Sequence, residues 1–214
     1  MKGIKIIGFD LDQTLYPKSP EIDEEIQKYI YQKISAFKGI SLADAEKLFK
    51  SYYPRISGRK TLVEIGFERH DAENAVQEAL EKADIAKFLV PDRRVLDLLQ
   101  KLKLRYDALC LITGSYKHIS DRKLEHLQIP ADMFDMVITG EVSKADGVAF
   151  EEWLRNYPGY KPDQFLYVGD RYNTDSEIPA KYGIRSVLVN ISEPDKTKNV
   201  RQLKVLFDIE KLLI

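Results

Sequence analysis

The chain of 214 residues has a single cysteine, Cys110, and no apolar run approaching the length of a membrane-spanning helix. One cysteine excludes an internal disulfide and a metal site built from several cysteines. Its 33 basic and 34 acidic residues give a formal charge of -1, which provides no electrostatic reason to expect a nucleic-acid polymer or a membrane surface as partner. The acidic Asp10 comes too early for the apolar region of a signal peptide, so we expect a cytoplasmic protein.

Short apolar runs, rich in β-branched residues, predict a parallel sheet. The three longest are residues 4–10, 108–113 and 165–170, and two shorter runs are 136–139 and 186–190. Apolar residues at helical spacing lie between these runs, as in the segment that follows Pro91. Continuous apolar strands that alternate with amphipathic helices predict an α/β fold, a doubly wound parallel sheet of Rossmann-like type.

Residues 16–90 interrupt this alternation, because they show amphipathic helical patterns and no strong strand. We therefore expect an α/β core of residues 1–15 and 91–214 and an inserted helical cap of residues 16–90. The cap would act as a lid that excludes water and selects the substrate. The C-terminal stretch from Lys196 is ambiguous; "VLFD" is a candidate edge strand and "IEKLLI" a candidate final helical turn.

Polar residues follow the apolar runs at the points where strands should end. Asp10 and Asp12 close the first run, and side chains two residues apart in a strand point the same way. Ligands of open parallel sheets bind beyond the carboxyl ends of the strands, so these residues should converge with others there. The others are Thr113, Gly114, Ser115, Lys144, Asp170 and Asp175.

A cluster of carboxylates at one edge of a sheet needs a neutralising partner, because like charges with little water around them repel. Ligands that are all oxygen atoms favour Mg²⁺ over zinc. We expect Asp10 and Asp170 to bind the ion through their side chains and Asp12 through its backbone carbonyl.

A metal ion and a lysine together favour a phosphoryl group as the guest. Lys144 can neutralise its oxygens, and the Thr113 hydroxyl can donate hydrogen bonds to them. The backbone amides of Gly114 and Ser115 are further donors. Asp10 can then attack phosphorus, while Asp12 protonates the leaving oxygen and later deprotonates the attacking water.

Four segments, "FDLDQTLYP", "LITGS", "SKADGVAF" and "YVGDRYNTD", resemble in order the four motifs of the haloacid dehalogenase (HAD) superfamily. Their spacing is similar to that of members with a helical cap after the first motif. The resemblance implies a phosphatase with Asp10 as nucleophile and Asp12 as acid and base, acting on a small phosphate ester. It also implies that Asp175 lies behind the metal ligands and orients metal-bound water or Lys144.

Two positions depart from the usual motifs. The third motif usually reads Lys-Pro-Asp-Pro, whereas Lys144 is followed here by Ala145, Asp146 and Gly147. The missing prolines change the stiffness of the backbone after the lysine but not its charge. Gln13 stands where Asn or Gly is commoner.

Two other functions on a similar framework are open. A 2-haloacid dehalogenase of the same superfamily lacks a carboxylate at the position of Asp12, since its halide leaving group needs no proton, so Asp12 favours the phosphatase. A receiver-like phospho-acceptor domain shares the residue types, but its acceptor Asp follows the third strand and it has no large helical insert.

The stretches "DLDQTLYP" and "SYYPRISGRKTLVEIGF" further resemble the pyrimidine 5′-nucleotidase branch, which implies a nucleoside monophosphate as substrate. The motifs do not specify the phosphoester or the oligomeric state. Several residues in or next to the helical insert are candidate substrate contacts, although packing and solvation are the commoner roles of such side chains. They are Tyr16, Tyr52, Tyr53, Arg55 and Arg59.

Overall fold

The computed structural model describes residues 1–17, 19–53 and 55–213. The chain divides into two compact units, one made of Met1–Pro17 and Leu89–Ile214 and the other of Lys18–Phe88. The first unit contains all the strands among the described residues, and the second is helical. None of the helices in the described ranges is both long enough and apolar enough to cross a lipid bilayer.

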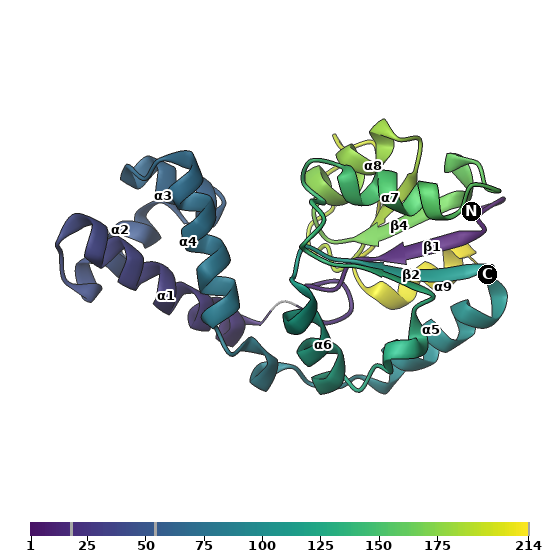
Figure 1. The fold of residues 1–214 in the computed structure, drawn as a ribbon, viewed down its shortest axis with the longest axis horizontal. Helices are drawn as coiled ribbons and strands as arrows, with labels where there is room; N and C mark the ends of the chain where they lie inside the picture. The colour runs from purple at the N-terminus through teal and green to yellow at the C-terminus, as the bar shows by residue number, and fades with distance from the viewer. Residues whose placement is uncertain (18, 54, 214) are drawn as a thin grey trace. The chain divides into compact units, whose positions relative to one another are not determined.

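The first unit is built on a sheet of six parallel strands in the order β3-β2-β1-β4-β5-β6 (Figure 1). The strands are β1 (Ile6–Phe9), β2 (Ala108–Ile112), β3 (Met136–Ile138), β4 (Phe165–Gly169), β5 (Arg185–Leu188) and β6 (Arg201–Gln202). Every residue of β1, β2 and β4 is buried, as continuous apolar runs predict for a sheet covered on both faces. The predicted doubly wound α/β fold is confirmed.

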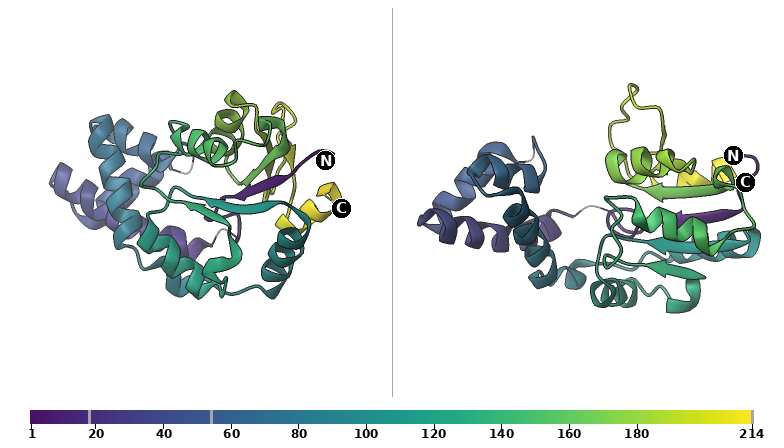
Figure 2. Two further views of the ribbon diagram at one scale, coloured as in Figure 1. Left: turned by 45° about the vertical axis from the view of Figure 1, so that its right-hand side comes forward. Right: turned by 45° about the horizontal axis from the view of Figure 1, so that its top comes forward.

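Helices cover both faces of this sheet. They are α5 (Arg93–Arg105), α6 (Lys117–His126), α7 (Val148–Asn156), α8 (Ile178–Lys181) and α9 (Glu210–Leu213). Figures 1 and 2 show α7 and α8 on one face and α5 and α9 on the other. Trp153 of α7 is fully buried against the sheet, with its ring centroid 4.9 Å from that of Phe165. A Cβ on Gly8 would lie 2.8 Å from the Trp153 ring, so glycine at this point of β1 makes room for the indole.

The prediction of an edge strand at residues 205–208 is wrong. The edge strand β6 lies earlier, where Arg201 and Gln202 pair with β5, and Leu206–Ile209 forms a turn of 3-10 helix. Leu206 and Ile209 are both buried, which a helical turn allows because residues three apart share a face. The final helical turn predicted from "IEKLLI" is present as α9, and Ile214 lies outside the described residues.

The second unit consists of α1 (Pro20–Lys38), α2 (Leu42–Tyr52), α3 (Gly58–Ile65), α4 (Arg69–Lys82) and a 3-10 turn, η1 (Ile85–Phe88). The four α-helices share one apolar core, made by Ile30, Ile34, Ala45, Phe49, Leu62, Ile65, Ala72, Ala75 and Ala79. The side chains of Ser41 and Ser57 accept hydrogen bonds from the first turns of α2 and α3. Gly39 and Gly66 end α1 and α3 in the left-handed conformation that glycine adopts without strain.

Gln128 also stands in a left-handed conformation, just after α6, with φ 56. The amide of Ile129 donates to the Leu124 carbonyl at 2.9 Å, so this is the end of a helix at which glycine is preferred. We expect Gln128→Gly to raise the free energy of unfolding by about 1 kcal/mol, because glycine has no Cβ to strain there. Urea unfolding measures the change.

The matched control for this substitution is Gln100, an exposed residue in the middle of α5. Gln100→Gly should lower the free energy of unfolding by about 1 kcal/mol, since glycine is unfavourable inside a helix. A loss of stability in both variants would contradict the strain assigned to Gln128.

Candidate active site

Asp10 lies directly after β1, at the carboxyl edge of the sheet. Its backbone amide donates to the Val168 carbonyl of β4 at 2.8 Å, which holds it in register with the neighbouring strand. Its buried carboxylate accepts a hydrogen bond from Lys144 Nζ at 2.7 Å. The same ammonium lies 2.9 Å from Asp175 Oδ1 and donates to Tyr167 Oη at 3.1 Å. Lys144 therefore joins two carboxylates from different segments.

Asp170 and Asp175 lie at and after the end of β4. Asp175 belongs to a π-helical turn, Asn173–Glu177, and its Oδ2 accepts from the amides of Asp170 at 3.0 Å and Arg171 at 2.8 Å. A Cβ on Gly169 would overlap the Asp175 carboxylate, so the glycine of "VGD" lets this side chain close against the strand end. Asp175 thus fixes the backbone that carries Asp170.

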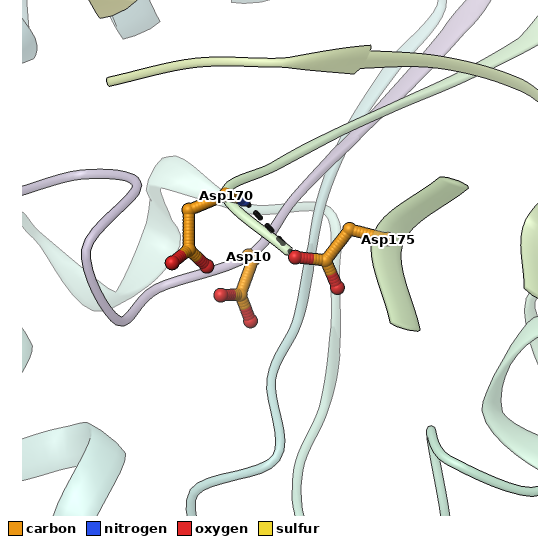
Figure 3. A group of neighbouring side chains, drawn as sticks. All are labelled: Asp10, Asp170 and Asp175. Carbon is orange, nitrogen blue, oxygen red and sulfur yellow. Dashed lines mark hydrogen bonds between the residues drawn. The ribbon is translucent and has the colours of Figure 1, made fainter. Parts of the chain in front are cut away.

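Asp10, Asp170 and Asp175 form one acidic cluster, shown in Figure 3. One carboxylate oxygen from each lies within 4.8 Å of the others. Burial and the neighbouring carboxylates raise the pKa of Asp10 to about 7, although Lys144 acts to lower it. Burial likewise raises the pKa of Asp170 to about 6, against the lowering effect of Arg171.

This acidic cluster fits a hard divalent cation. Within the described residues, the buried Asp170 Oδ1 has no hydrogen-bond partner. Asp175 Oδ1 also has no hydrogen-bond partner there, but it forms an ion pair with Lys144 at 2.9 Å, and Oδ2 accepts from two backbone amides. Asp10 and Asp170 are therefore the side chains that would hold the ion, and Asp175 supports them from behind.

Asp12 lies near this cluster, since its charge also acts to raise the pKa values of Asp10 and Asp170, but its hydrogen-bond partners are different. Strand β1 ends at Phe9 and a turn begins at Asp12, so Asp12 lies outside the strand and has hydrogen-bond partners different from those of Asp10. The Oδ1 atom of Asp12 accepts hydrogen bonds from Tyr16 Oη and Lys123 Nζ, and its Oδ2 accepts from Ser115 Oγ at 2.6 Å. Burial acts to raise the pKa of Asp12, but the Lys123 charge and these hydrogen bonds lower it to about 2.

Lys123 was missed by the sequence reasoning. Its side chain is 3% exposed and lies at a position of α6 that faces the protein interior. The signal was present, since Ser120, Lys123, Leu124 and Leu127 repeat at the spacing of one helix face and all are buried. A lysine on such a face needs a partner of opposite charge, and here the partner is Asp12.

The segment after β2 carries Thr113, Gly114 and Ser115. Thr113 is buried, and its Oγ1 accepts from the Ser115 amide at 3.1 Å. The Ser115 hydroxyl donates to Asp12 and accepts from Lys123 at 2.8 Å. A Cβ on Gly140 would lie 3.0 Å from the Gly114 carbonyl carbon, so the next strand end packs closely on this loop.

The loop after Lys144 is ordered without the prolines of the usual motif. Ser143 Oγ donates to Asp146 Oδ2 at 2.7 Å and accepts from the Asp146 amide at 3.2 Å. Gly147 has φ 88, and a Cβ there would overlap the Tyr182 ring. A side-chain turn and a left-handed glycine therefore provide the stiffness that prolines provide elsewhere.

Gln13 adopts the left-handed conformation, with φ 58, which explains why Asn or Gly is commoner there. The carbonyls of Gln13 and Thr14 accept hydrogen bonds from Asn190 Nδ2 at 2.8 and 3.2 Å. Asn190 Oδ1 in turn accepts from the Leu206 amide at 3.2 Å. Asn190 therefore holds the turn that follows Asp12.

The candidate substrate contacts near the insert have local roles. Tyr16 binds Asp12, and Tyr53 stacks on Phe49 with ring centroids 5.1 Å apart. Tyr52 packs on the core of the helical unit. Arg59 forms an ion pair with Glu73 at 2.9 Å, and Arg55 is exposed.

The fold and this site define a hydrolase of one family: the chain belongs to the haloacid dehalogenase-like hydrolases, whose family model matches residues 4–183. Among curated proteins, Phosphate metabolism protein 8 of Saccharomyces cerevisiae is 30% identical over 139 residues, which are 61% of this chain and 42% of the yeast protein. The chain thus spans less than half the length of that relative.

Solved structures with a similar fold include two at full or nearly full coverage. A haloacid dehalogenase-like hydrolase from Streptococcus pneumoniae has a TM-score of 0.72 with 18% identity and covers 100% of both chains. A HAD phosphatase from Thermococcus onnurineus has a TM-score of 0.67 with 22% identity and covers 98% of both. At these identities the likeness establishes the fold.

We expect the acidic cluster to destabilise the metal-free protein as the pH rises from about 4 to about 7. The pKa values of Asp10 and Asp170 lie above the value of 3.8 for an unperturbed Asp, so in this window the folded state binds more protons than the unfolded chain. Each extra bound proton lowers the free energy of unfolding by about 1.4 kcal/mol per pH unit as the pH rises. Mg²⁺ replaces these protons, so it should stabilise the protein more at about pH 7.5 than at about pH 5.

Urea unfolding with EDTA or with Mg²⁺ at the two pH values measures this effect. Asp170→Asn should remove most of the Mg²⁺-dependent gain, whereas Asp97→Asn, at a half-exposed position of α5, should keep it. A gain of equal size at both pH values would contradict the assignment of the cluster as a cation site.

Proposed function

We propose that this protein is a Mg²⁺-dependent phosphatase that hydrolyses a small phosphomonoester through a phospho-aspartate intermediate. The observation that carries the proposal is the pairing of two carboxylates with two lysines at one sheet edge: Asp10 with Lys144, and Asp12 with Lys123. Membership of the family supports a hydrolase. The name of the yeast relative and the phosphatase from Thermococcus onnurineus with a similar fold support phosphate chemistry.

Asp10 is the nucleophile in this proposal, because it lies at the strand end among the residues that would hold the ion and beside Lys144. Bound Mg²⁺ would supply the positive charge that lets a phosphate dianion approach these carboxylates. Attack of Asp10 on phosphorus displaces the alcohol of the ester. Lys144 neutralises oxygens of the transferring group, and the Thr113 hydroxyl and the Gly114 amide can donate to them.

Asp12 is the acid and base. Because its pKa is about 2 in the free protein, Asp12 must first take up a proton when substrate is bound; it then gives this proton to the oxygen of the leaving alcohol, and it later removes a proton from the water that attacks the phospho-aspartate. The Ser115 amide donates to Thr113 Oγ1, so binding of phosphate to this amide exchanges that partner. A nucleoside monophosphate is the substrate that the resemblance to pyrimidine 5′-nucleotidases favours.

Release of phosphate from p-nitrophenyl phosphate tests the proposal. We expect activity with Mg²⁺, loss of activity in EDTA, and recovery when Mg²⁺ is restored, because without the cation the carboxylates repel the substrate. Asp10→Asn should form no labelled phospho-enzyme from a ³²P-labelled substrate. Hydrolysis that continues in EDTA, or a phospho-enzyme in Asp10→Asn, contradicts the mechanism. A panel of nucleoside monophosphates and sugar phosphates then identifies the substrate class.

Asp12→Asn separates the phosphatase from the dehalogenase alternative. We expect kcat for phosphate esters to fall about 10²–10⁴-fold while substrate still binds, since the amide cannot exchange a proton. Steady-state kinetics with phosphate esters and chloride release from 2-haloacids provide the two measurements. Chloride release by the wild type that survives Asp12→Asn would favour the dehalogenase.

A further inference from the structure

We propose that Lys123 is a positioning residue for the acid and base carboxylate, and that its ammonium holds Asp12 and Ser115 in one fixed arrangement. The inference rests on the proposed phosphatase function and adds to it a group outside the four motifs. Lys123 contacts no substrate in this proposal; it acts through Asp12.

The burial of Lys123 is the first observation that carries the inference. Its side chain is 3% exposed, whereas that of Lys117, on the same helix, is 71% exposed. An ammonium group loses its hydration when it is buried, so it is tolerated only where other groups replace the water. The hydrogen bonds of Lys123 to Asp12 Oδ1 and Ser115 Oγ do so.

The geometry of these bonds is the second observation. Lys123 donates to Asp12 Oδ1 and to Ser115 Oγ, and Ser115 Oγ donates to Asp12 Oδ2. The three side chains close a triangle that engages both oxygens of Asp12 and so fixes the rotation of its carboxylate. Tyr16 adds a further hydrogen bond to Oδ1 but makes no bond to Ser115 among the described contacts.

The triangle also joins two parts of the sheet edge. Asp12 follows β1 and Ser115 follows β2, while Lys123 reaches both from the second turn of α6. Proton transfer depends steeply on the position of the transferring group. Without Lys123 the Asp12 carboxyl group has only hydroxyl donors and more freedom to rotate, so it faces the leaving oxygen less often.

A positioning role for Lys123 predicts an effect on the kinetics that a purely structural role does not predict. Loss of Lys123 should slow reactions whose leaving oxygen needs a proton more than reactions whose leaving group departs readily as an anion. The ratio of kcat/KM for an alkyl phosphomonoester to kcat/KM for p-nitrophenyl phosphate reports this difference.

We expect Lys123→Met to lower kcat/KM for the best alkyl phosphomonoester of the substrate panel about 10–100-fold and that for p-nitrophenyl phosphate by at most about 3-fold. Methionine keeps the volume and removes the charge. The control is Lys101→Met, on the surface of α5, which removes an exposed ion pair with Glu210 and should change neither value. Equal losses on both substrates in Lys123→Met would overturn the inference.

A double-mutant cycle makes the test independent of a general loss of stability. In the Asp12→Asn background, the further change Lys123→Met should alter kcat/KM for the alkyl phosphomonoester less than about 2-fold, since Lys123 acts through the Asp12 carboxylate. If Lys123→Met alone fails to fold, as judged by near-UV circular dichroism, Asp12→Asn is compared with Asp12→Asn/Lys123→Met, which leaves no carboxylate without its cation. A loss of 10-fold or more in that comparison overturns the inference.

The results also separate this inference from the proposed function. A wild-type protein that releases no phosphate from any ester contradicts the phosphatase itself. If the wild type is a phosphatase and Lys123→Met has the same ratio of kcat/KM for the two substrates as the wild type, only the role of Lys123 is contradicted.

Discussion

The site depends on the electrostatic neutralisation of carboxylates that the fold holds away from water. The strand ends bring Asp10, Asp170 and Asp175 into one cluster, and Lys144 supplies a single positive charge between two of them. Burial and the neighbouring carboxylates raise the pKa values of Asp10 and Asp170, although Lys144 and Arg171 act to lower them. Asp12 forms an ion pair with Lys123, and its pKa is lowered instead. Asp10 and Asp12, two residues apart in one motif, therefore have pKa values shifted in opposite directions by their different surroundings.

Much of this arrangement follows from the order of residues along the chain. Buried apolar runs predict the strands, and ligands of a parallel sheet bind at its carboxyl edge, so Asp10, Thr113 and Asp170 could be expected to meet. The alternation of strands and helices, with a helical insert after the first strand, predicted the fold class. These inferences rest on periodicity and on topology rules, which depend little on the detailed packing of side chains.

Other features could not be predicted because they depend on where the chain turns. The different hydrogen-bond partners of Asp10 and Asp12 are one such feature, because β1 ends at Phe9 and strand boundaries are poorly specified by sequence. The edge strand was misplaced because Leu206 and Ile209 read equally well as strand or helical turn. Lys123 was overlooked because a lysine in a charged helix is ordinarily solvated, and only tertiary packing reveals that it faces inward.

The hydrogen bonds of Asn190 link the segment after β5 to the turn at the carboxyl end of β1. This side chain, just beyond β5, bridges the Leu206 amide and the carbonyls of Gln13 and Thr14. The turn that follows Asp12 is therefore anchored in part by the segment after β5. An insertion or deletion between β5 and Leu206 would disturb these hydrogen bonds of Asn190. The tolerance of this region to insertion therefore depends on its contacts with Gln13 and Thr14.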